Sequence, residues 1–199
     1  MKILKYLLIT LVALAVIFFA IGYIYPSVQY GHEITVDKPI EEAWAVAYDE
    51  SKYNQWLQGF KSIELVTGKQ GEVGSTYKVV VSPDPSQPDF EMTETVVSKK
   101  EFDHVTLHFE SDLMDFDQTM SYADKDGVVS VKTDSKVMGK SASMRSMFFL
   151  MEKLGGAFQK QEAKNIDALK KVINENTTDY YPVEEVPVEE MAEEEVLAE

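Results

Sequence analysis

The chain has 199 residues, of which 45% are apolar and 11% aromatic, which suffices for one folded domain with its own core. The formal net charge is −15, and no basic stripe suits a phosphate backbone, which argues against nucleic-acid binding. The absence of cysteine excludes disulfides, thiolate catalysis and cysteine-ligated metal sites.

The first predicted element is an apolar helix at the N-terminus. Tyr6–Tyr25 contains no charged residue and, at ~1.5 Å per residue, reaches about 30 Å, enough to cross the hydrocarbon core of a bilayer. Lys2 and Lys5 precede it, and the next basic residue is Lys38, so the positive-inside rule places the N-terminus in the cytoplasm. We therefore expect a single-pass protein with an extracytoplasmic domain, anchored in the inner membrane if the source is bacterial.

A cleaved signal peptide is the alternative interpretation of this segment. Ala20-Ile21-Gly22 has the small-x-small pattern of a cleavage site. The apolar run is longer than the roughly 7–15 residues of a signal-peptide core, which favours an anchor over residues 1–26.

The predicted domain occupies residues 27–176 and begins with a strand and two helices. Gln29–Val36 alternates apolar and polar residues, as a half-buried strand does. Pro39 opens a helix, and a second short helical stretch is expected at about Ser51–Leu57. Six more strands are predicted at Lys61–Thr67, Ser75–Ser82, Asp89–Lys99, His104–Glu110, Leu113–Ala123 and Val128–Met138. Their short connections imply antiparallel pairing.

The last predicted element is one long helix from Ser141 to about Asn174. Gly155-Gly156 interrupts it and marks a kink, a close approach of sheet or ligand, or a break between two helices. This order of elements predicts an α+β fold, with a curved antiparallel sheet packed against one long C-terminal helix. The apolar residues expected on one stripe of that helix are Met144, Met147, Met151, Leu154, Phe158, Ile166, Leu169 and Ile173.

The remaining residues, 177–199, form an acidic tail that we expect to be disordered. Asp179 to Glu199 holds nine acidic and no basic residues, and Pro182-Val183-Glu184-Glu185 recurs as Pro187-Val188-Glu189-Glu190. The tail is either solvated without a specific role or a docking segment for a basic protein partner.

Three stretches carry a family resemblance: Ile34–Trp44 followed by Tyr53-Asn54-Gln55-Trp56, then Gly71–Tyr77, then the Met/Phe-rich C-terminal helix ending in Leu169-Lys170-Lys171. Together they resemble the START-like, Bet v-type SRPBCC superfamily, which includes proteins labelled polyketide cyclase/dehydrase. The resemblance implies a helix-grip fold, in which the sheet wraps the long helix and leaves a cavity. It also implies binding of lipids, sterols, polyketides or other apolar molecules, with catalysis in a minority of members.

Strand alternation and the helical stripe identify the side chains that would line such a cavity. Glu94 shares the inward parity of Met92 and Val96, where an ionised carboxylate is costly unless paired or hydrated. It is therefore a polar anchor for a ligand, a general base, or a side chain turned outward at a bulge or at the rim of the sheet. The candidate ligand-binding residues are Tyr77, Phe90, Met92, Glu94, Phe109, Gln118, Met120, Met147, Met151 and Phe158.

No catalytic residue, cofactor or metal site is predicted. His104 and His108 lie four residues apart on one strand, about 13 Å from each other, which is too far for a shared metal ion. Three functions remain open. The favoured one is membrane-tethered binding of an apolar small molecule or lipid; the others are a cyclase/dehydratase-type enzyme in the same cavity and an interaction domain with a filled core.

Overall fold

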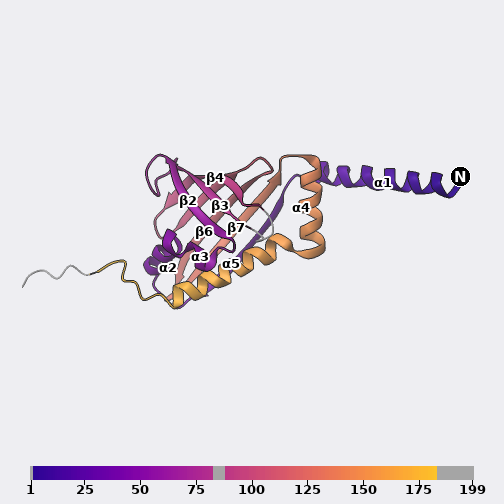
Figure 1. Cartoon of the computed structure of the whole chain (residues 1–199). Helices are drawn as coiled ribbons and strands as arrows, with labels where there is room; N and C mark the ends of the chain where they lie inside the picture. The colour runs from indigo at the N-terminus through magenta and orange to yellow at the C-terminus, as the bar shows by residue number, and fades with distance from the viewer. Residues whose placement is uncertain (1, 83–87, 183–199) are drawn as a thin grey trace, which may run out of the picture.

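The computed structural model describes residues 2–82 and 88–182. Helix α1 (Lys2–Ile24) projects from one end of the folded domain (Figure 1). It is long and apolar enough to cross a membrane, a property that an N-terminal signal sequence shares. The predicted apolar helix is thus confirmed, and its crossing of a bilayer stays a prediction.

Seven strands form one antiparallel sheet in the order β1-β7-β6-β5-β4-β3-β2. Strand β1 (Val28–Val36) pairs with the last strand, while β2 to β7 are sequential neighbours. The other bounds are β2 Phe60–Thr67, β3 Thr76–Val81, β4 Phe90–Lys100, β5 His104–Glu110, β6 Met114–Lys125 and β7 Val128–Gly139. All seven predicted strands are confirmed, with ends that differ by no more than about two residues, the usual scatter of strand boundaries.

The sheet is bent by local irregularities. Residues Asp126 and Gly127 have φ angles of 56° and 81° and connect β6 to β7 as a two-residue turn, the geometry that suits the twist of a hairpin. Register shifts of the bulge type add curvature, and they fall between Phe60 and Ser62, Leu65 and Thr67, and Val96 and Ser98.

Three short helices follow β1 and fill one end of the sheet. They are α2 (Ile40–Ala47), the 3-10 turn η1 (Glu50–Lys52) and α3 (Tyr53–Trp56). Both α2 and α3 bury a tryptophan, Trp44 and Trp56 respectively. The two predicted helical stretches are therefore confirmed.

The C-terminal region forms two helices, so Gly155-Gly156 marks a break between helices, which is one of the three interpretations left open by the sequence, and the long helix on the sheet is the second of them. Helix α4 (Ala142–Gly155) ends at Gly156, whose left-handed φ of 60° a glycine adopts without strain, and α5 (Ala157–Asn174) starts in a new direction. The Glu152 carboxylate accepts hydrogen bonds from the backbone N–H groups of Phe158 (2.9 Å) and Gln159 (3.3 Å), so it caps the second helix. Figure 1 shows α5 running across the sheet and α4 standing at its end.

The main core joins α5 and α2 to the sheet. Ile166, Leu169 and Ile173 are completely or almost completely buried, next to Val129 and Val131 of β7. The stripe predicted along the whole C-terminal region therefore holds in α5. In α4 the predicted stripe is not buried. The new direction of the chain buries Ser146 and Phe148 instead and leaves Met147, Met151 and Leu154 exposed.

The segment after α5 returns to the domain. The Tyr180 hydroxyl donates a hydrogen bond to Asp49 Oδ2 at 2.6 Å, and Asn176 donates to Glu42 Oε1 at 2.7 Å. Contacts of the domain therefore reach beyond the predicted boundary at residue 176. The predicted acidic tail from residue 183 onward lies outside the described residues.

Candidate functional site

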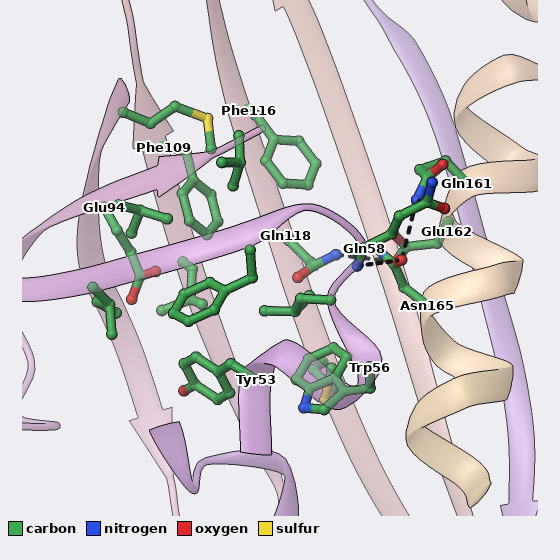
Figure 2. A pocket seen from close by; sticks show the side chains of 18 of the residues that line it. Tyr53, Trp56, Gln58, Glu94, Phe109, Phe116, Gln118, Gln161, Glu162 and Asn165 are labelled. Atoms are coloured by element: carbon green, nitrogen blue, oxygen red, sulfur yellow. Dashed lines mark hydrogen bonds between the residues drawn. The ribbon is translucent and has the colours of Figure 1, made fainter. Parts of the chain in front are cut away.

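A cavity of about 260 Å³ lies between the inner face of the sheet and helices α3 and α5 (Figure 2). Most of its wall is aromatic or aliphatic, with a few amide and carboxylate side chains. Its volume lies just below the roughly 300–1,000 Å³ of drug-sized pockets, so it suits a compact molecule. The lining residues are Tyr30, Ala47, Tyr48, Tyr53, Trp56, Leu57, Gln58, Phe60, Ile63, Val79, Val81, Met92, Glu94, Val105, Leu107, Phe109, Phe116, Gln118, Met120, Phe158, Gln161, Glu162 and Asn165.

Sequence reasoning placed ten residues in this cavity, and the structure brings six of them together there: Met92, Glu94, Phe109, Gln118, Met120 and Phe158. Each strand member of this group has the inward parity that alternation predicts. These six residues come from the three strands β4, β5 and β6 and from the first turn of α5.

The other four predicted residues lie elsewhere. Tyr77 lines an adjoining hollow, and Phe90, the first residue of β4, lies outside both hollows. Met147 and Met151 are 40% and 45% exposed on α4 and do not reach the cavity. Their placement in the cavity depended on a continuous C-terminal helix, and the break at Gly156 removes that premise.

A second hollow of about 260 Å³ adjoins the cavity and shares Glu94 and Tyr53 with it. It is more polar, with Glu50, Gln70 and Lys99 in its wall. Glu94 therefore stands where an apolar chamber meets a polar one, and a ligand in the first chamber can present a polar group at this junction.

The Glu94 side chain is half-buried, and no residue of the described chain hydrogen-bonds to its carboxyl group. Burial raises the pKa of Glu94 from its ordinary value of 4.5 to about 7, and the charge of Glu50 adds to the effect. Near neutral pH the group is thus divided between a neutral form that donates a hydrogen bond and an anion that accepts one. The structure supports the inward orientation that strand parity indicated for Glu94.

We expect this carboxyl group to make the free energy of unfolding depend on pH. Below about pH 4.5 it is protonated in the folded and unfolded states alike. Between about 4.5 and about 7 the folded state keeps a proton that the unfolded chain has released, so stability falls by up to ~1.4 kcal/mol per pH unit. Above about pH 7 the free energy of unfolding falls no further, and its total decrease amounts to ~3 kcal/mol.

Urea unfolding of the wild type and of Glu94→Gln at a series of pH values measures this dependence. The neutral amide does not titrate, so the variant should show a flatter profile between pH 4.5 and 7. Glu162→Gln is measured for comparison. It removes the second carboxyl group of the cavity, whose pKa burial also raises. An unchanged profile in Glu94→Gln would contradict the assignment.

Glu162 of α5 is a second carboxylate in the cavity, and sequence reasoning missed it. Gln118 Nε2 donates a hydrogen bond to Glu162 Oε1 at 3.0 Å, and Ser135 Oγ donates at 3.4 Å. Figure 2 shows Glu162 across the cavity from Glu94, with Gln118 between them. The signal was in the sequence, because Glu162 precedes Ile166 by four residues and so lies on the buried stripe of α5.

Three amide side chains border the cavity between α5 and the start of β2. Gln161 Nε2 donates to Gln58 Oε1 and to Asn165 Oδ1, both at 3.1 Å, and the Gln58 backbone N–H donates to Asn165 at 3.2 Å. Nearby, the Trp56 indole N–H is buried without an acceptor among the described residues.

A run of aromatic rings leads from the cavity wall to α4. Phe109 stacks on Phe116 at 5.2 Å between centroids, and Tyr30 stacks on Phe158 at 5.4 Å. Phe158 then meets Phe148 of α4 edge-on, also at 5.4 Å. The end of the cavity formed by Phe158 is therefore in direct contact with α4.

The three histidines each lie beside a different aspartate. His32 pairs with Asp167, His104 with Asp103, and His108 with Asp117. Over residues 2–82 and 88–182 no group of three or more histidine, aspartate or glutamate side chains lies close enough together to hold a metal ion.

No protein-family model and no curated protein matches the sequence, but solved structures share the fold. The di-domain ARO/CYC protein BexL of the BE-7585A biosynthetic pathway aligns with a TM-score of 0.58 at 9% identity, covering 77% of this chain and 52% of that one. A protein from Thermus thermophilus aligns at 0.57 and 12%, covering 76% and 100%. A Staphylococcus aureus protein of unknown function aligns at 0.58 and 11%, covering 74% and 93%.

These likenesses are at the level of the fold, and this chain spans about half the length of BexL. Together with the seven-stranded antiparallel sheet and the C-terminal helix, they define an α+β helix-grip protein with an SRPBCC-like fold. The resemblance seen in the sequence is thereby confirmed for the fold.

Proposed function

We propose that this chain is a membrane-anchored protein that binds a compact apolar molecule, or one chain of a lipid, in its internal cavity. The observation that supports this function is the cavity itself, an apolar chamber with two carboxylates in its wall, the half-buried Glu94 and the buried Glu162. A domain with a filled core would not contain such a space. A carboxyl group without a hydrogen-bond partner inside the domain costs free energy unless a ligand or water molecule binds to it.

The charges of the wall narrow the chemistry of the ligand. The described lining of the cavity contains two carboxylates and no lysine, arginine or histidine. A fatty-acid carboxylate or a phosphate would meet like charge there, so the ligand is neutral or cationic. A hydroxyl or amine beside Glu94 fits, because either can donate to the carboxylate, and a hydroxyl can also accept from the protonated form.

We further propose that α1 remains attached as the anchor, with the domain on the extracytoplasmic side. Lys2 and Lys5 support this orientation. The contact between α1 and α4 also supports retention, because Gly22 of the candidate cleavage site is buried in it. N-terminal sequencing of the mature protein tests this, and a start near Tyr23 would refute it.

Closing the cavity with a larger side chain tests the binding function. Leu107 lines both hollows, so Leu107→Trp places a bulky ring in them. The control is Leu65→Trp on β2, a leucine that is 42% exposed. We expect Leu107→Trp to weaken the binding of the neutral apolar dye N-phenyl-1-naphthylamine by at least about tenfold, the equivalent of ~1.4 kcal/mol.

Dye fluorescence titration of detergent-solubilised protein gives the affinities, and circular dichroism confirms that both variants fold. Leu65→Trp should bind like the wild type. Native mass spectrometry after membrane extraction should show a co-purifying apolar molecule in the wild type and in Leu65→Trp, and none in Leu107→Trp. Equal dye binding by all three proteins would refute the cavity as the site.

A further inference from the structure

The end of α1 is built into the domain through α4. The Ser146 hydroxyl of α4 donates to the backbone carbonyl of Phe18, and the Tyr25 ring stacks on Phe149 with centroids 4.2 Å apart. Gly22 lies so close to α4 that a Cβ atom there would overlap the carbonyl oxygen of Ala142. The last two turns of α1 are therefore held against the first two turns of α4.

This contact limits the length of α1 that is free to cross a bilayer by itself. The uncharged stretch that remains, Tyr6–Ile17, rises only ~18 Å, against about 30 Å for the hydrocarbon core. Even with the stems of Lys2 and Lys5 added, the free part is too short. A spanning α1 must therefore bring the segment Phe18–Tyr25, and with it α4, down to the boundary of the hydrocarbon.

The outer side of α4 has the composition that such a position requires. Met147, Met151 and Leu154 are 40%, 45% and 84% exposed, and their spacing of four and three residues places them on one stripe. On the helical wheel this stripe lies between the side that holds α1, with Ala142, and the side that faces the core, with Phe148. Figure 1 shows that α4 stands at the end of the domain from which α1 projects.

We propose that α4 lies in the outer interface of the bilayer that α1 crosses, with Met147, Met151 and Leu154 immersed among the lipids. This inference rests on the proposed anchor. The molecules that contact the stripe are lipids. An apolar stripe on a helix at this depth is typical of interfacial helices. The arrangement also brings the Phe158 end of the cavity next to lipid through Phe148, so an apolar ligand has a short path from the bilayer.

A fluorescent label on single cysteines tests the depth of α4. The chain has no cysteine, so each introduced thiol is the only site of labelling. The variants Leu154→Cys on α4, Leu11→Cys on α1 and Lys160→Cys on α5 all replace exposed side chains, which leaves the packing intact. The full-length proteins are labelled with the environment-sensitive dye NBD and reconstituted into neutral phosphatidylcholine vesicles with spin-labelled lipids.

We expect the label at residue 154 to emit at shorter wavelength than the label at residue 160, and to be quenched best by lipids spin-labelled near the headgroup. The label at residue 11 should be quenched best by lipids spin-labelled deep in the chain. Quenching at residue 11 with none at residue 154 would overturn the placement of α4 and leave the anchor intact. No quenching at either position would overturn both, and a blue-shifted but unquenched label at residue 154 would overturn the lipid contact and assign the stripe to a second copy of this chain.

Discussion

Replacing Leu169 with alanine is expected to lower the free energy of unfolding by about 2–5 kcal/mol. Leu169 has no exposed surface and lies on α5 between the sheet and α2. Truncation removes apolar contacts and leaves a cavity that the surrounding β-sheet closes only in part. This is a large share of the roughly 5–15 kcal/mol that stabilises a typical domain, so the variant should unfold at a much lower urea concentration.

The matched control is Leu154→Ala in α4. Leu154 is 84% exposed, so in detergent its truncation should change the stability by no more than about 0.5 kcal/mol. The buried tryptophans Trp44 and Trp56 report unfolding of both variants by fluorescence. If the two substitutions cost the same, α4 and α5 do not differ in burial as the structure describes.

Replacing Gly22 with leucine is expected to separate α1 from α4. A side chain at this position meets the carbonyl oxygen of Ala142 and the Ser146 hydroxyl, and backbone cannot move aside as a flexible side chain does. Overpacking of this kind costs about 1–3 kcal/mol. This cost is comparable to the free energy that the few contacts between the two helices contribute. The α1 helix should then lose its fixed orientation relative to the domain.

Spin labels on cysteines introduced at Leu14 and Lys160 measure that orientation by electron–electron double resonance. The protein with Gly22 should give one narrow distance distribution, and Gly22→Leu a broad one. The control is Ala13→Leu, an exposed position of α1 that should leave the distribution narrow. An equally narrow distribution in Gly22→Leu would show that α1 is not fixed by this contact.

The sheet was predictable because alternation along a strand is a local property. The inward parity of Met92, Glu94 and Phe109 follows from counting residues, and the structure places all three in the cavity wall. Turn residues such as Asp126-Gly127 marked the ends of strands for the same local reason. The stripe of α5 was predictable as well, and extending it backward by one turn reaches Glu162, which lines the cavity.

The two C-terminal helices were harder to separate. Leu154 and Leu169 have similar apolar neighbourhoods in the sequence, and both were assigned to one buried stripe. The direction that the chain takes after Gly156 decides which of them meets the sheet, and two adjacent glycines are compatible with a kink or a break. Met147 and Met151 were misplaced for this reason.

The sequence by itself predicted the local features of this protein: an apolar helix of membrane-spanning length, seven alternating strands and the inward parity of Glu94, whereas the helix-grip architecture was implied by the family resemblance. Each depends on periodicity or composition within a few residues. Only the tertiary structure decided that Glu162 lies across the cavity from Glu94, that α4 leaves the core, and that Gly22 fits against Ala142. These contacts join residues far apart in the chain, and such pairings follow from how whole elements pack, which no local pattern records.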